Sequence, residues 1–209
     1  MASQPPHDRS CFHIAIICAL KVEMEAVQEV MERVDEYHKR GYGKANGDPH
    51  SYTTGMIPSH NVVLVHLAGM GANSAGSAAA SVKFSFVNIK LALITDICGG
   101  VPNPQGRTRI HLGDLVISTA VVQYDFGRQY ERGFKRKTGL EDVYGRPNEE
   151  TRSFINKLNT RRQHHKLLSD LHATLQQLEQ QHSGYSRPQT VTDVLVDASY
   201  LHKHHSMTE

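Results

Sequence analysis

The chain has 209 residues, of which 39% are hydrophobic and 21% charged, and its formal net charge is +2. This length suits one domain with a real hydrophobic core and is short for two, and the composition is that of an ordinary globular protein. The small net charge does not by itself indicate a polyanionic partner. We expect neither a signal peptide nor a membrane anchor, because the start of the chain is polar and no apolar run has the length of a membrane span.

The first half of the chain predicts strands and helices in alternation. The apolar run 14–18 predicts a strand, and apolar residues at helical spacing predict a helix over 24–34. Two further strands are expected at 52–57 and 61–67, joined by a turn. The small-residue stretch 75–82 predicts a helix that packs closely against the sheet.

The second half is less regular. Residues 91–94 predict a parallel strand buried on both faces, and the β-branched run 115–122 predicts another strand. From about residue 127 the chain becomes basic and rich in glycine, and we expect no strand before 191–196. Leucines at helical spacing predict a helix over 168–178. This order of elements favours the α/β class.

The chain has three cysteines, in or beside apolar runs and without CxxC spacing: Cys11, Cys18 and Cys98. This argues against a disulfide framework and against a zinc site. The histidine-rich stretch 202–205 has no carboxylate or cysteine at ligand spacing, and it does not indicate a metal site. We therefore expect a reduced, cytoplasmic protein without a metal or another cofactor.

The segment after the strand expected at 91–94 is the most informative for function. It runs through Ile97 and Cys98 into the pair Gly99 and Gly100. In open α/β sheets, ligands bind outside the carboxyl ends of the strands, where backbone amides reach a sugar or an anion. A double glycine also occurs in ordinary turns, so both interpretations stay open at this point.

Four segments in order and spacing carry a family resemblance. They are Ile14 to Leu20 with Glu23, Leu67 to Gly71, Ile97 to Pro102 and His111 to Ser118. Together they resemble the nucleoside phosphorylase and nucleosidase superfamily, and in particular the domains that open fungal NLR-type and ankyrin-repeat proteins. The resemblance implies a three-layer α/β/α fold around a mixed, partly closed sheet. The domain would span 12–205, between a disordered tail at 1–11 and a short tail at 206–209.

The resemblance also implies cleavage of the N-glycosidic bond of a purine nucleoside or nucleotide. Breaking this bond builds an oxocarbenium-like ribose, so the site must orient the sugar and deliver water or phosphate. By resemblance, Glu23 is the catalytic carboxylate that orients water. A carboxylate polarises water and repels phosphate, so hydrolysis is favoured over phosphorolysis. The alternative, that Glu23 only complements a helix dipole, stays open.

The resemblance assigns substrate binding to two glycine-bearing turns. Gly69, Met70 and Gly71 would form a backbone cradle beside the sugar or phosphate, at the start of a helix. The same glycines would also suit close packing of that helix on the sheet. The next strand end would line the nucleoside site with four residues: Ile97, Cys98, Gly99 and Gly100.

Two departures from the family pattern bear on activity. Asp96 stands where family members usually carry glycine. Its side chain would bind ribose hydroxyls or repel phosphate if it faces the crevice, and would destabilise the core if it points inward. The late family segments that hold the ribose and protonate the base are missing, so we expect a fold that is incomplete at its C-terminal end, with an exposed sheet edge.

These departures leave a second function open. The chain would then be a non-catalytic interaction or sensing remnant of a fungal NLR-type N-terminal domain. Basic residues gather between 128 and 166, but they suit a solvated surface better than a nucleic-acid surface, so a nucleic-acid partner is disfavoured. A homo-oligomer is expected only if the fold is whole.

Overall fold

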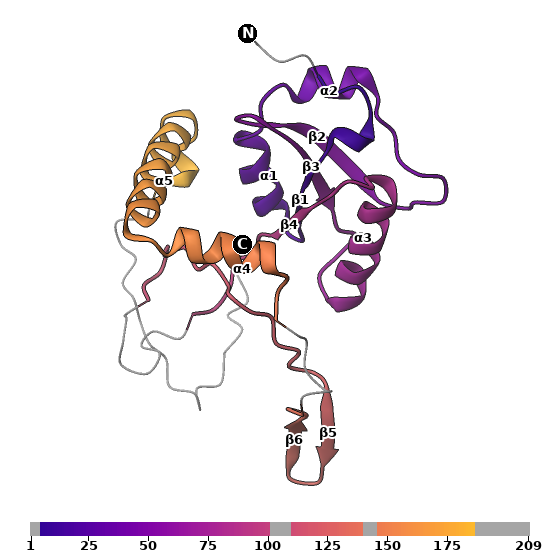
Figure 1. The fold of residues 1–209 in the computed structure, drawn as a ribbon, viewed down its shortest axis with the longest axis vertical. Coiled ribbons are helices and arrows are strands. Elements are labelled where there is room, and N and C mark those ends of the chain that lie inside the picture. The colour runs from indigo at the N-terminus through magenta and orange to yellow at the C-terminus, as the bar shows by residue number, and fades with distance from the viewer. Residues whose placement is uncertain (1–4, 101–109, 140–145, 187–209) are drawn as a thin grey trace, which may run out of the picture. The chain divides into compact units, whose positions relative to one another are not determined.

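The fold is shown by a computed structural model (Figure 1), which describes residues 5–100, 110–139 and 146–186. The chain divides into two compact units, Met1–Gly99 and Gly100–Glu209. The first unit contains a four-stranded sheet with helices. The second contains a two-stranded hairpin and two α-helices.

The first unit alternates strands and helices, as its sequence predicts. In chain order its elements are η1 (Arg9–Cys11), β1 (Ile14–Cys18), α1 (Lys21–Glu29), α2 (Val34–Arg40), β2 (Ser51–Ile57), β3 (His60–His66), α3 (Ala72–Ser85) and β4 (Leu91–Ile94). The strands expected at 14–18, 52–57 and 61–67 are confirmed to within one residue at each end. The helix expected over 24–34 is instead two short helices, because the chain turns at Arg33, which has a left-handed φ of 60°.

The sheet of the first unit is mixed, with strand order β2-β3-β1-β4. β1 pairs in parallel with β3 and β4, and Ile16 aligns with Leu64 on one side and Leu93 on the other. β2 pairs with β3 as an antiparallel hairpin. Within residues 5–100 this sheet is open, so the partial closure implied by the family resemblance is not found in the described chain.

Two hydrophobic clusters lie on opposite faces of this sheet, because alternate strand residues point to opposite sides. On one face, Ala78 and Val82 of α3 pack with Ile17 and Val65. On the other face, Met24 of α1 packs against a second set of strand residues: Ile16, Cys18, Val62 and Leu64. Helix, sheet and helix thus form three layers (Figure 1). The predicted close packing of the small-residue helix is confirmed, since Ala78 is fully buried.

β4 confirms the parallel strand expected at 91–94, but the prediction that it is buried on both faces is wrong. It lies at the edge of the sheet, and the side chains of Leu93 and Ile94 are 41% and 76% exposed. The reason is that only one of its edges pairs with a strand in the described chain.

The second unit has short local elements. They are β5 (Gly127–Tyr130), β6 (Gly133–Arg136), α4 (Glu149–Leu158), α5 (Arg161–Gln181) and η3 (Ser183–Tyr185). The side chain of Asn148 caps α4 by accepting from the Thr151 amide at 2.8 Å. α5 confirms the helix expected over 168–178. None of the helices that the structure describes is long and apolar enough to cross a membrane.

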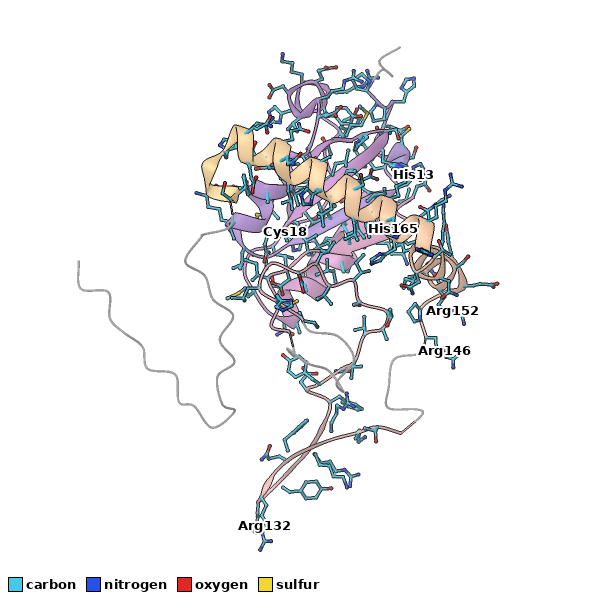
Figure 2. The ribbon with its side chains drawn as sticks, turned by 90° about the vertical axis from the view of Figure 1, so that its left-hand side faces the viewer. His13, Cys18, Arg132, Arg146, Arg152 and His165 are labelled. Carbon is cyan, nitrogen blue, oxygen red and sulfur yellow. The ribbon has the colours of Figure 1, made fainter. Side chains whose placement is uncertain are left out.

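Two strand predictions in the second unit are wrong. Residues 115–122 form no strand, because their β-branched side chains have no neighbouring strand to pair with and remain largely exposed. Conversely, β5 and β6 form a hairpin where no strand was expected, with Arg132 at its turn (Figure 2). Gly133, with φ of 133°, supplies the turn conformation that other residues rarely adopt. The strand expected at 191–196 lies outside the described residues.

Candidate functional site

The candidate site lies where the three parallel strands of the first unit end. Cys18, the last residue of β1, aligns with His66, the last residue of β3. Just beyond β4, the Thr95 amide donates a hydrogen bond of 3.1 Å to the carbonyl oxygen of Ile17. The chain leaves these strand ends for α1 and α3. This is the edge at which open α/β sheets bind ligands.

Glu23 is buried at this edge, with 8% of its surface exposed. Its Oε2 atom accepts hydrogen bonds from the amides of Ala19 at 3.1 Å and Leu20 at 2.9 Å, which are orphan donors at the start of α1. Its Oε1 atom accepts from the amide of Ile97 at 3.1 Å. Glu23 therefore caps α1 and also fixes the segment that follows β4.

These bonds set the ionisation of Glu23. Burial alone raises the pKa of the Glu23 carboxyl, but the amides of Leu20, Ile97 and Ala19 outweigh burial and lower the pKa below its ordinary value. The carboxylate is therefore ionised at neutral pH. A carboxylate held in this way accepts a hydrogen bond from water and orients it, while its low basicity makes it a weak proton acceptor.

Asp96 lies beside Glu23. It directly precedes Ile97, whose amide binds the Glu23 carboxylate, and the residue itself is exposed. The hypothesis that Asp96 points into the core is therefore wrong. Two carboxyl groups instead share one strand end.

The Cys18 thiol lies at the same strand end, at the last residue of β1. Its Sγ atom lies 3.0 Å from Oγ1 of Thr95, and the residue is 1% exposed. Burial raises the pKa of the Cys18 thiol, and the negative charge of Glu23 adds to this, while the Thr95 hydroxyl opposes it. The protonated thiol is suited to packing and not to nucleophilic attack.

His66 was missed by sequence reasoning. Its Nε2 atom lies 2.8 Å from Oγ1 of Thr53, and its Nδ1 atom lies 3.2 Å from the sulfur of Met24. Burial lowers the pKa of the His66 imidazole, so the ring is neutral at neutral pH. Its position one residue before the end of the strand expected at 61–67 is the signal that would have found it.

The turn before α3 holds the predicted cradle residues. Gly71 has φ of 110° as the N-cap of α3, a conformation that favours glycine, and no side chain caps this helix. A Cβ atom on Gly69 would meet nothing within 4 Å, so close packing does not explain that glycine. The side chain of Met70 is 74% exposed. The turn is therefore open, and its ligand-binding role stays a prediction.

Of the predicted residues after β4, Ile97 is held at the same edge by a hydrogen bond. The Ile97 amide binds Glu23 while its side chain is 70% exposed. Cys98 and Gly99 are exposed next to it in the chain, and Gly100 begins the second unit. Within the described chain, no three histidine, cysteine or acidic side chains gather in a way that would hold a metal ion.

The first unit is a three-layer α/β unit with an ionised carboxylate and glycine turns at its strand ends, the edge at which open sheets of the α/β class bind ligands. A family model for the phosphorylase superfamily matches residues 13–179, and the chain belongs to this superfamily. This confirms the family inferred from the four sequence segments.

A relative among curated proteins agrees with the fungal resemblance. A nucleotide-binding leucine-rich repeat (NLR)-like protein from the fungus Hyaloscypha variabilis is 32% identical over 131 residues. The match covers 60% of this chain but 13% of that protein, so the chain spans a small part of its length. No solved structure matches the chain.

Proposed function

We propose that this domain cleaves the N-glycosidic bond of a purine nucleoside or nucleotide, and that water rather than phosphate is the nucleophile. The observation that supports this most is the ionised Glu23 carboxylate, fixed by amides from both the β1–α1 turn and the segment after β4. A fixed negative charge favours water and disfavours a phosphate dianion. Membership of the phosphorylase superfamily supports a nucleoside as the class of substrate.

Each part of the edge would have its own role. The Glu23 carboxylate would orient the attacking water and stabilise the positive charge that develops on the ribose. The open amides before α3, at Gly69, Met70 and Gly71, would seat the sugar. Ile97 and the residues that follow it to Gly100 would line the nucleoside site from the next strand end.

The setting of the reaction is also part of the proposal. We place it in the cytoplasm, in agreement with the three free cysteines, and without a metal or another cofactor. The partner is a small purine nucleoside or nucleotide, with phosphate not required. A homo-oligomer would complete the site only if the fold is whole.

The experiment is a base-release assay. The purified chain is incubated with a panel of purine nucleosides and nucleotides, with and without inorganic phosphate, and free base is separated by chromatography. We expect release that does not depend on phosphate and that is lost in Glu23→Gln. Release only in the presence of phosphate would contradict hydrolysis.

The second candidate is the non-catalytic sensing or interaction domain. It is favoured if a chain shown to be folded by circular dichroism releases no base. The observation that supports this candidate is Asp96, which adds a carboxyl beside Glu23.

A further inference from the structure

Asp96 is the residue of the strand-end cluster that the proposed function does not use. Its neighbours hold its place on both sides: the Thr95 amide donates to Ile17 at 3.1 Å, and the Ile97 amide donates to Glu23 at 3.1 Å. The backbone of Asp96 is therefore fixed at the carboxyl edge of the sheet. Its side chain is exposed, so a ligand at this edge would meet it.

The neighbouring groups do not offset its negative charge. Glu23 is ionised, the Cys18 thiol is protonated, and the His66 ring is neutral. Lys21, in the first turn of α1, pairs with Glu25 at 3.3 Å, and its side chain is 87% exposed. Within residues 5–99, this cluster thus has a net negative charge and no cation built into it.

The start of α3, where no side chain caps the helix, is a feature of this edge that attracts anions. A helix N-terminus is equivalent to roughly half a positive charge. Against it stand the ionised Glu23 carboxylate and a second acidic side chain, Asp96, at the same strand end. The carboxyl groups therefore outweigh the helix, and a phosphate placed at this edge would be repelled.

A neutral sugar is not repelled at this edge. Ribose hydroxyls are hydrogen-bond donors, and carboxylates are acceptors with several free lone pairs. The Asp96 carboxyl can therefore accept a hydrogen bond from a ribose hydroxyl without an opposing charge. Hydrogen bonds to an ionised acceptor are also stronger than neutral ones.

We infer that Asp96 is a specificity-determining residue, which makes this site select uncharged nucleosides and reject ligands that carry phosphate. This inference rests on the proposed nucleoside site, and it limits the proposed ligands to those without a phosphate group. The repulsion would act on phosphate as an attacking group and also on the 5′-phosphate of a nucleotide. Glycine at this position would leave the edge with the charge of Glu23 alone.

The test is calorimetric titration of the whole chain with adenosine and with adenosine 5′-monophosphate, a pair that differs by the phosphate. We expect the wild-type chain to bind adenosine more tightly than the monophosphate. Asp96→Asn should raise the affinity for the monophosphate by about tenfold, since it removes one charge, and should weaken adenosine binding slightly. Asp35→Asn is the matched control, because Asp35 is exposed in the first turn of α2 and not at a parallel strand end.

The outcomes separate this inference from the proposed function. Equal affinity of the wild-type chain for the two ligands overturns the role of Asp96 and leaves the nucleoside site standing. So does a gain in monophosphate affinity that is equal in Asp96→Asn and Asp35→Asn. If no variant binds either ligand, and base release is also absent, the nucleoside site and the inference fall together.

Discussion

The Oε1 atom of Glu23 and the backbone amide of Ile97, 74 positions apart in the chain, are joined by a hydrogen bond of 3.1 Å. This bond ties the start of α1 to the segment after β4. The other carboxylate oxygen caps α1. One side chain thus organises two of the three turns at the candidate site, so its structural and proposed catalytic roles can be separated only by measuring both.

Glu23→Gln should affect activity more than stability. The amide side chain keeps one acceptor oxygen, but its NH₂ group cannot accept from a backbone amide, so at least one of the present hydrogen bonds is lost. We expect a loss of about 1 kcal/mol in the free energy of unfolding. Base release should fall by about a hundredfold or more, because the charge that orients water is removed.

Glu25→Gln is the control for this experiment. It makes the same chemical change two positions further along α1, where the side chain is half exposed and pairs with Lys21. Both measured quantities should stay close to those of the wild-type chain, because exposed ion pairs contribute little. Equal loss of activity in the two variants would remove the special role of Glu23.

Two glycine substitutions should change stability in opposite directions. A Cβ atom on Gly55 of β2 would lie 2.9 Å from Cε of Met31, 3.1 Å from the carbonyl oxygen of Glu32 and 3.2 Å from Cγ2 of Val34. The Glu32 carbonyl cannot easily move, because it accepts from the Met56 amide at 3.0 Å. Gly55→Ala should therefore cost about 1–3 kcal/mol in urea unfolding.

Gly76 provides the comparison. It lies inside α3, and a Cβ atom there would meet nothing within 4 Å. Gly76→Ala should therefore raise the free energy of unfolding by about 0.5–1 kcal/mol, because alanine loses less backbone entropy in a helix. A destabilising Gly76→Ala would show that the packing around α3 is tighter than the structure indicates.

The sequence predicted the first unit well because its signals are local. The run 14–18 and the hairpin strands that end near Ile57 and His66 pair with one another, and helices pack on both faces of the sheet they form. The run 115–122 has the same β-branched composition but no strand beside it, and composition does not specify a partner. The hairpin β5–β6 was missed for the opposite reason: its polar residues give no strand signal, although the two strands pair. That pairing depends on the turn at Gly133.

The site was predictable in part. Glu23 stands out in the sequence because it follows a predicted strand by a few residues, at a helix start. Its hydrogen bond with the Ile97 amide could not be predicted from the residues alone, because it depends on the parallel register of β1 and β4. His66 and Thr95 join the site for the same reason: strand ends become neighbours only when the register is known.

Tyr37 offers a test of the core that leaves the candidate site untouched. The residue is 1% exposed, its hydroxyl donates to Oδ1 of Asn61 at 2.7 Å, and its ring packs edge-on against Phe12. Tyr37→Phe keeps the ring and removes the hydroxyl. It should cost about 1 kcal/mol in the free energy of unfolding, because the Asn61 oxygen loses its donor. No change would mean that water replaces the hydroxyl.

Asp48 makes the stability of the first unit sensitive to acid. Its Oδ2 atom accepts hydrogen bonds from the hydroxyls of Ser85 at 2.5 Å and Tyr52 at 2.6 Å, and its Oδ1 atom accepts from the His50 amide at 2.8 Å. Burial alone raises the pKa of the Asp48 carboxyl, but these bonds outweigh burial and lower the pKa to about 2. The network holds the loop before β2 to the end of α3.

The folded-state pKa of Asp48 lies below its unfolded value of about 4, so the charged form stabilises the fold above that value. This stabilisation should be lost as the pH falls from about 4 to about 2, at a cost on the order of 2 kcal/mol. Urea unfolding of the wild-type chain across this window should show the loss. Asp48→Asn should be less stable at neutral pH and flatter across the window, whereas Asp35→Asn should keep the wild-type slope. A wild-type slope in Asp48→Asn would assign the acid sensitivity to another carboxyl group.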